Sequence, residues 1–214
     1  MELPNIKYRG DIAKFIESVD DGDEIFYFKD TEYFLEDSTY SKFVKEVERT
    51  VRTSPDYNNY VAYIKGTIGL NFCQAMSNVY ESKNVQIEMH HGPIFTLYDI
   101  CETVLEWFIQ NNQRINTFRV AEKVLDEHYN LRVQTIMFSK TAHEAWHNRD
   151  IFTSLGQAFG DIDAFIKFYT PYLSQEQKYK IWNYINLCES NPAFAESFDT
   201  GILDLDYVKK YVKL

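Results

Sequence analysis

The sequence predicts an α+β fold that is predominantly helical. Apolar residues recur at helical spacing in most of the long segments, whereas only three short segments show the alternation or aromatic content of strands. With 45% hydrophobic and 16% aromatic residues, a chain of 214 residues can bury one sizeable core or two small ones. No internal repeat or low-complexity linker marks a firm domain boundary.

Residues 1–84 are expected to form an N-terminal α+β region. Its predicted elements are helix 6–19, strand 24–29 and helices 38–53, 57–65 and 71–80. Ser38 has a side chain suited to cap the helix that follows it. Pro55 interrupts that helix, and Gly66 and Gly69 mark the next break.

Residues 85–152 are expected to carry the functional region. From Val85 to His91 apolar and polar residues alternate, which predicts a half-buried strand that ends at Gly92-Pro93. Helices are predicted at 96–111 and 117–128, and a second strand at 131–139. Thr141 and Glu144 have capping-box spacing for a helix that begins directly after this strand.

Residues 153–214 are expected to form a helical C-terminal region. Ser174 and Gln177 repeat the capping-box spacing before the segment "KYKIWNYINL". The three regions are also compatible with one single domain that contains all of them.

The net charge of −10 restricts any nucleic-acid-binding surface to a local patch, because phosphate contacts require basic side chains. Acidic residues concentrate at 20–24, 32–37 and 196–206, which is compatible with a protein partner for an acidic surface. The middle of the chain is more balanced. Six basic residues there are candidate nucleic-acid contacts or a solvated face: Arg114, Arg119, Lys123, Arg132, Lys140 and Arg149.

The three cysteines are an odd number without a C-x-x-C pair, which argues against a disulfide framework and predicts buried thiols. No segment approaches the length of apolar sequence that spans a bilayer, and the N-terminus shows no signal pattern. We therefore expect a cytoplasmic protein with no membrane partner.

Four of the five histidines form two pairs. His143 and His147 are four residues apart on a predicted helix, so they lie one turn apart on the same face. His90 and His91 end the strand that begins near Val85. Together the pairs follow a strand, strand, helix order that is typical of a metal site. His128 is expected at a surface or a helix end.

The segments "IEMHH" (87–91) and "TIMFSKTAHEAWHNR" (135–149) resemble the HNH, or ββα-metal, nucleases, in particular the colicin-type DNases. The resemblance implies a ββα-metal hairpin with a helical pair inserted between its strands. It implies that His90, His143 and His147 are metal ligands, that His91 is the general base, and that Glu88 supports the site. The amide position of the motif falls on Gln134, with Asn130 as the alternative.

The function that this resemblance implies is hydrolysis of phosphodiester bonds, in double-stranded DNA, with one divalent ion. Zn, Ni, Co, Mn and Mg are all candidates, and imidazole ligands favour the first three. An isolated motif in a small protein is compatible with a phage or mobile element. Two alternatives remain: a catalytically silent protein that binds another protein, and an acidic DNA mimic that acts as an inhibitor.

Overall fold

The computed structural model describes residues 28–148, 150–190 and 202–214. Within these ranges most elements are helices, accompanied by one sheet of two antiparallel strands, which confirms the helix-rich α+β class. The predicted helix 6–19 lies outside the described residues, as does all but the end of the predicted strand 24–29. In the described part of the chain, no helix has the length and apolar character needed to cross a membrane.

The described residues fall into two compact units. Unit 1 contains residues up to Tyr60 together with Leu97–Asn130, and unit 2 contains Val61–Thr96 together with Leu131–Leu214. The helix α3 (Pro55–Gly66) contributes residues to both. The expected division of the chain into regions 1–84, 85–152 and 153–214 stays a prediction.

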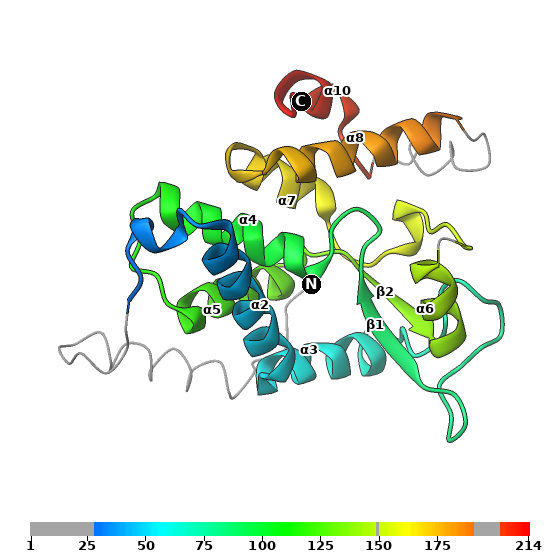
Figure 1. Ribbon diagram of the computed structural model, residues 1–214. Coiled ribbons are helices and arrows are strands. Elements are labelled where there is room, and N and C mark those ends of the chain that lie inside the picture. The colour runs from blue at the N-terminus through cyan, green and yellow to red at the C-terminus, as the bar shows by residue number, and fades with distance from the viewer. Residues whose placement is uncertain (1–27, 149, 191–201) are drawn as a thin grey trace. The chain divides into compact units, whose positions relative to one another are not determined.

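Unit 1 is built from helices, and Figure 1 shows them in blue and green. Its elements are η1 (Thr31–Phe34), α2 (Asp37–Thr53), the first part of α3, α4 (Leu97–Gln110) and α5 (Thr117–Tyr129). The core side of α2 carries Val44, Val47 and Val51, all fully buried. This spacing places them on one helical face, against α4 and α5. Helices α4 and α5 confirm the helices predicted at 96–111 and 117–128.

The start of α2 differs from the prediction. The helix begins at Asp37 with Glu36 at the N-cap, and no side chain caps it. The assignment of Ser38 as the cap was wrong, because helical geometry is already adopted one residue earlier. The interruption at Pro55 is confirmed, since α2 ends at Thr53 and α3 begins with the proline.

Unit 2 contains the sheet. Strand β1 (Ile87–His91) pairs antiparallel with β2 (Thr135–Ser139), with Ile87 opposite Ser139 and His91 opposite Thr135. The predicted second strand is confirmed only over its last five residues. Helix α6 (Lys140–His147) follows β2 without a loop, and the Ser139 hydroxyl accepts a hydrogen bond from the Ala142 N–H at 3.4 Å. The predicted cap by Thr141 and Glu144 was therefore wrong.

The helix predicted at 71–80 was also wrong. This segment forms a turn in which the Cys73 N–H donates to the Val79 carbonyl at 2.7 Å. Gln74 then bonds to β2: its N–H donates to the Met137 carbonyl at 2.8 Å, and its Oε1 accepts from the Met137 N–H at 2.7 Å. Non-local bonds to the strand thus replace the local bonds of a helix.

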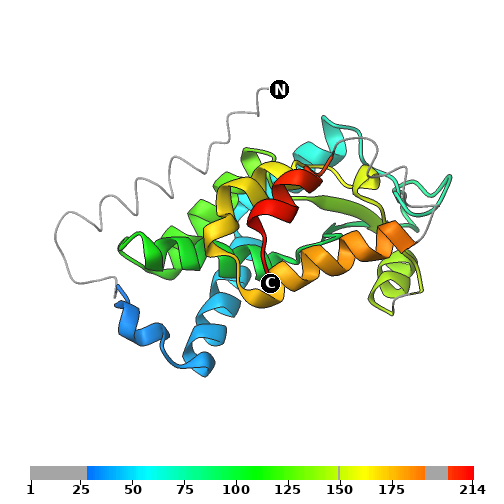
Figure 2. The same cartoon turned by 90° about the horizontal axis from the view of Figure 1, so that it is seen from above.

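The C-terminal part of unit 2 is helical, as predicted. It contains η2 (Leu155–Gln157), α7 (Ile162–Tyr169), η3 (Thr170–Tyr172), α8 (Gln175–Ser190) and α10 (Leu205–Tyr211). The Ser174–Gln177 capping box is confirmed, since each backbone N–H donates to the side chain of the other residue at 3.1 and 3.3 Å. Figure 2 shows α10 beside α7 and α8, where Trp182 Nε1 donates to the Val212 carbonyl at 2.7 Å.

The three cysteines Cys73, Cys101 and Cys188 are buried free thiols, as predicted.

Candidate metal centre

Alternation along β1 divides its side chains between two faces. Glu88 and His90 lie on the face that packs against α6, whereas Ile87, Met89 and His91 lie on the other. Ile87 and His91 are both buried, at 1% and 2% exposure. The two adjacent histidines of the motif therefore occupy different environments.

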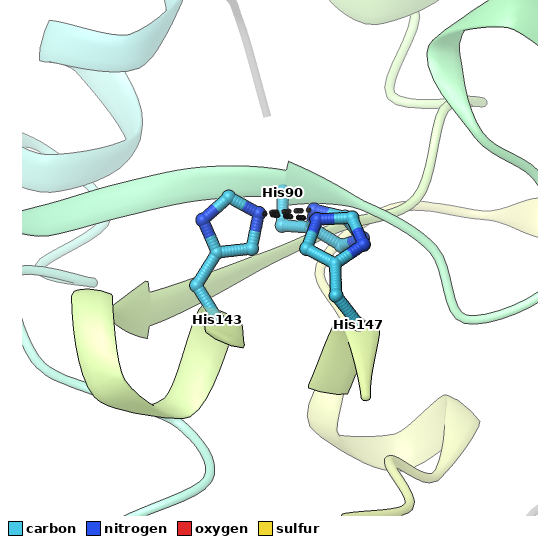
Figure 3. A group of neighbouring side chains, drawn as sticks. All are labelled: His90, His143 and His147. Carbon is cyan, nitrogen blue, oxygen red and sulfur yellow. Dashed lines mark hydrogen bonds between the residues drawn. The ribbon is translucent and has the colours of Figure 1, made fainter. Parts of the chain in front are cut away.

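Three histidine side chains converge on the α6 face. Figure 3 shows His90 reaching from β1 and His143 and His147 reaching from α6, with their rings directed toward one point. His143 Nε2 lies 3.1 Å from His90 Nδ1 and 3.0 Å from His147 Nε2. One nitrogen of each residue lies within 4.8 Å of the other two. The spacing His-x-x-x-His brings the α6 pair together, and the strand pairing adds the third ring.

Glu88 fixes the orientation of the central ring. Its Oε2 lies 2.9 Å from His143 Nδ1. A carboxylate can only accept this hydrogen bond, so Nδ1 carries the proton and Nε2 of the neutral ring presents its lone pair to the other two histidines. A carboxylate behind a histidine ligand is a frequent arrangement in metal sites, because it sets the tautomer and raises the basicity of the ligand.

The dimensions of the cluster fit a small divalent ion. A tetrahedral ion with metal–nitrogen bonds of about 2.0–2.1 Å separates two ligand nitrogens by roughly 3.3 Å. The distances from His143 Nε2 to the nitrogens of His90 and His147 differ from this value by only a few tenths of an ångström, and the third pair lies within 4.8 Å. His147 is exposed, which leaves a solvent-facing side for water or a substrate. Three imidazoles are a donor set that suits Zn²⁺, Ni²⁺ or Co²⁺ better than Mg²⁺.

Two aromatic side chains that sequence reasoning missed hold His90 in place. The ring of Phe138 stacks on His90 with centroids 5.8 Å apart, and Trp146 packs against it with centroids at 4.3 Å. Phe138 lies opposite Glu88 in the strand register, and Trp146 precedes His147 on α6. The register of the two strands would have revealed Phe138, whereas the approach of Trp146 depends on how α6 packs on the sheet.

His91, the expected general base, and Gln134, expected at the amide position that orients it, are both buried. His91 lies opposite Thr135, which is 1% exposed, on the face of β1 away from the three-histidine cluster. Gln134 is 3% exposed, and neither atom of its side-chain amide has a hydrogen-bond partner among the described residues. Asn130, the alternative, is the exposed C-cap of α5 in unit 1.

The basic candidates that the structure describes are divided between the two units. Arg114, Arg119 and Lys123 belong to unit 1, and Lys123 Nζ makes an ion pair at 3.1 Å with Glu127, whose side chain is fully buried. In unit 2 the guanidinium of Arg132 lies 5.1 Å from the ring centroid of Phe168, and Lys140 is exposed. Arg149 lies outside the described residues.

His128 is fully buried near the end of α5, so the expectation of a surface position was wrong and that of a helix end is confirmed.

The fold and the site thus define a class: a mostly helical α+β protein with a three-histidine cluster between a strand and the helix that follows its partner strand. The chain belongs to the family described as Bacteriophage G278-like virion protein, whose model matches residues 7–213. This membership confirms the phage association. Comparison with curated proteins found no match, and comparison with solved structures found none.

Proposed function

We propose that this virion-family protein is a metal-dependent nuclease of the phage particle, with its centre at His90, His143 and His147. The observation that carries the proposal is the convergence of three imidazole nitrogens in a strand, strand, helix element, with Glu88 behind His143. These are the positions that the resemblance to ββα-metal nucleases assigns to the ligands. The proposed location is the phage particle, because the family is one of virion proteins, and the expected cytoplasmic location stays a prediction.

The reaction is hydrolysis of a phosphodiester: water attacks phosphorus, the bond to the leaving oxygen breaks, and that oxygen takes up a proton. A bound divalent ion supplies Lewis acidity that polarises the phosphate and offsets the charge on the leaving oxygen. The three histidines would hold the ion, and Glu88 would keep His143 in the ligating tautomer. In the role that the resemblance gives it, His91 would accept the proton from the attacking water, which requires the end of β1 to bring its ring to the cluster.

A second candidate function is favoured by the burial of His91. With 2% of its surface exposed on the face away from the cluster, this histidine reaches substrate only after the end of β1 rearranges. If β1 stays as described, the metal centre is a structural cross-link between β1 and α6 in a catalytically silent virion component. The third hypothesis, an acidic DNA mimic, depends on the acidic segments 20–24, 32–37 and 196–206. Residues 20–24 and 196–201 lie outside the described residues.

Metal binding is the first test. Calorimetric titration of the metal-free full chain with Zn²⁺ and Ni²⁺ should give one ion per chain. His147→Ala should remove most of this binding. Glu144→Ala is the matched control, because it changes an exposed residue of the same helix that lies outside the histidine cluster. Equal affinity in the His147 variant would exclude that residue from the site.

Cleavage is the second test, and it separates the two functions. Wild-type protein with Zn²⁺, Ni²⁺, Co²⁺, Mn²⁺ or Mg²⁺ should cleave supercoiled plasmid or single-stranded circular DNA, and His147→Ala should cleave neither. A wild-type protein that binds one ion but cleaves neither DNA nor RNA with any of these ions would refute the nuclease proposal. That result would instead support the structural metal centre.

A further inference from the structure

A pocket of about 830 Å³ adjoins the three-histidine cluster within unit 2. His147 belongs to both, since it contributes a nitrogen to the cluster and also lines the pocket. Trp146, Phe152 and Tyr184 supply three aromatic walls, and Asp150 adds an exposed carboxylate. A group bound in this pocket would therefore lie next to the phosphate position of the proposed nuclease.

The aromatic walls are held in place by one buried residue, Thr153, which is 1% exposed. Trp146 Nε1 donates to the Thr153 hydroxyl at 3.0 Å, and the Tyr184 hydroxyl donates to the Thr153 carbonyl at 3.2 Å. Phe152 stacks on Tyr184 with ring centroids 5.6 Å apart and planes 20° from parallel. The walls are thus oriented before any ligand binds, which reduces the entropy cost of binding.

The chemistry of these walls indicates a flat aromatic ligand. A flat ring of a ligand can stack on aromatic side chains that are already stacked on one another. The exposed Asp150 carboxylate can accept a hydrogen bond from an exocyclic amino group of that ligand. The volume falls in the range of about 300–1,000 Å³ that small-molecule sites occupy. In a duplex both faces of each base are already stacked, so only an unpaired base can enter.

We propose that this pocket binds an unstacked nucleobase that adjoins the scissile phosphate, and that the substrate is single-stranded nucleic acid. This inference rests on the proposed nuclease function. It also explains how a chain with a net charge of −10 binds nucleic acid, because stacking on an aromatic wall requires no basic surface.

Binding without metal tests the pocket independently of catalysis. The probe is a fluorescein-labelled oligo(dA) of 12 nucleotides, titrated with the full chain in EDTA and followed by fluorescence anisotropy. The single strand should bind at least about 10-fold more tightly than its duplex with oligo(dT). Phe152→Ala should weaken single-strand binding by roughly 5- to 150-fold, the usual effect of removing one base–aromatic stack.

Two further variants and one altered probe make the result specific. Phe152→Leu keeps apolar volume but removes the aromatic face, so it should lose affinity as well. Phe168→Ala is the matched control, because Phe168 is an exposed aromatic residue of α7 that does not line the pocket. An oligonucleotide of the same length without bases should bind wild type as weakly as oligo(dA) binds Phe152→Ala.

Equal binding of single strand and duplex, equal binding of the probe without bases, or undiminished affinity in folded Phe152 variants would overturn the inference. Failure of the nuclease proposal looks different. If no ion supports cleavage but Phe152-dependent binding of the single strand persists, the base pocket stands and hydrolysis is refuted. If duplex and single strand are cleaved equally and the Phe152 variants retain full activity, hydrolysis stands and the pocket is refuted.

Discussion

Replacing His128 by glutamine should remove a large part of the pH dependence of stability in unit 1. The His128 ring is fully buried, its Nδ1–H donates to the Val124 carbonyl at 2.8 Å, and Tyr57 and Tyr60 pack edge-on against it. Burial lowers the pKa of His128 from 6.5 to about 4, because the charged ring loses its water. Nearby Arg52 lowers this pKa further, whereas the Val124 carbonyl and Glu127 oppose the shift.

The direction of the pH effect on stability depends on whether the folded or the unfolded chain binds a proton at residue 128 at the higher pH. Below a pH of about 6.5 the unfolded chain takes up a proton at His128, whereas the folded chain does so only near pH 4. The contribution of His128 to stability is therefore complete above pH 6.5 and is lost as the pH falls toward 4. At about 1.4 kcal/mol per pKa unit, the difference between 6.5 and about 4 corresponds to a loss of roughly 3–4 kcal/mol.

The assay is urea unfolding at several pH values between 7 and 4, followed by circular dichroism and by hydrogen exchange of the α5 amides, which report on unit 1. Other titrating groups are shared by wild type and His128→Gln, so they cancel in the difference between the two unfolding free energies. This difference should shrink as the pH falls, because only the wild type loses stability through residue 128. Parallel pH profiles for the two proteins would refute the argument from burial.

Three further predictions concern single residues of the two units. Glu88→Gln should weaken Zn²⁺ binding by about 10- to 100-fold in calorimetry, because the carboxylate orients His143; unchanged affinity would remove Glu88 from the centre. His91→Ala should keep one ion per chain while DNA cleavage falls by about 10²- to 10⁴-fold, and loss of the ion from a folded variant would instead make His91 a ligand. Lys123→Met should lower the free energy of unfolding by about 1–3 kcal/mol, because it removes the cation beside the buried Glu127 carboxylate. A urea midpoint equal to that of wild type would show that this ion pair is dispensable.

The helices of unit 1 and the grouping of the histidines were readable from the sequence. Their signals are local: apolar residues three and four apart define α4 and α5, and the spacing of His143 and His147 brings them together on α6. The capping box at Ser174 and Gln177 is equally local. Strand alternation also places His91 on the face of Ile87 and Met89, a consequence that the motif alone does not reveal.

The rest was decided by contacts between residues distant in the sequence. Segment 71–80 was expected to be a helix, but Gln74 makes hydrogen bonds to β2, more than 60 residues away. The environment of His128 depends on tyrosines of α3, and the walls beside His147 depend on Tyr184 of α8. Periodicity specifies which face of an element is apolar. Which partner covers that face, and how much water it excludes, follows only from the packed chain.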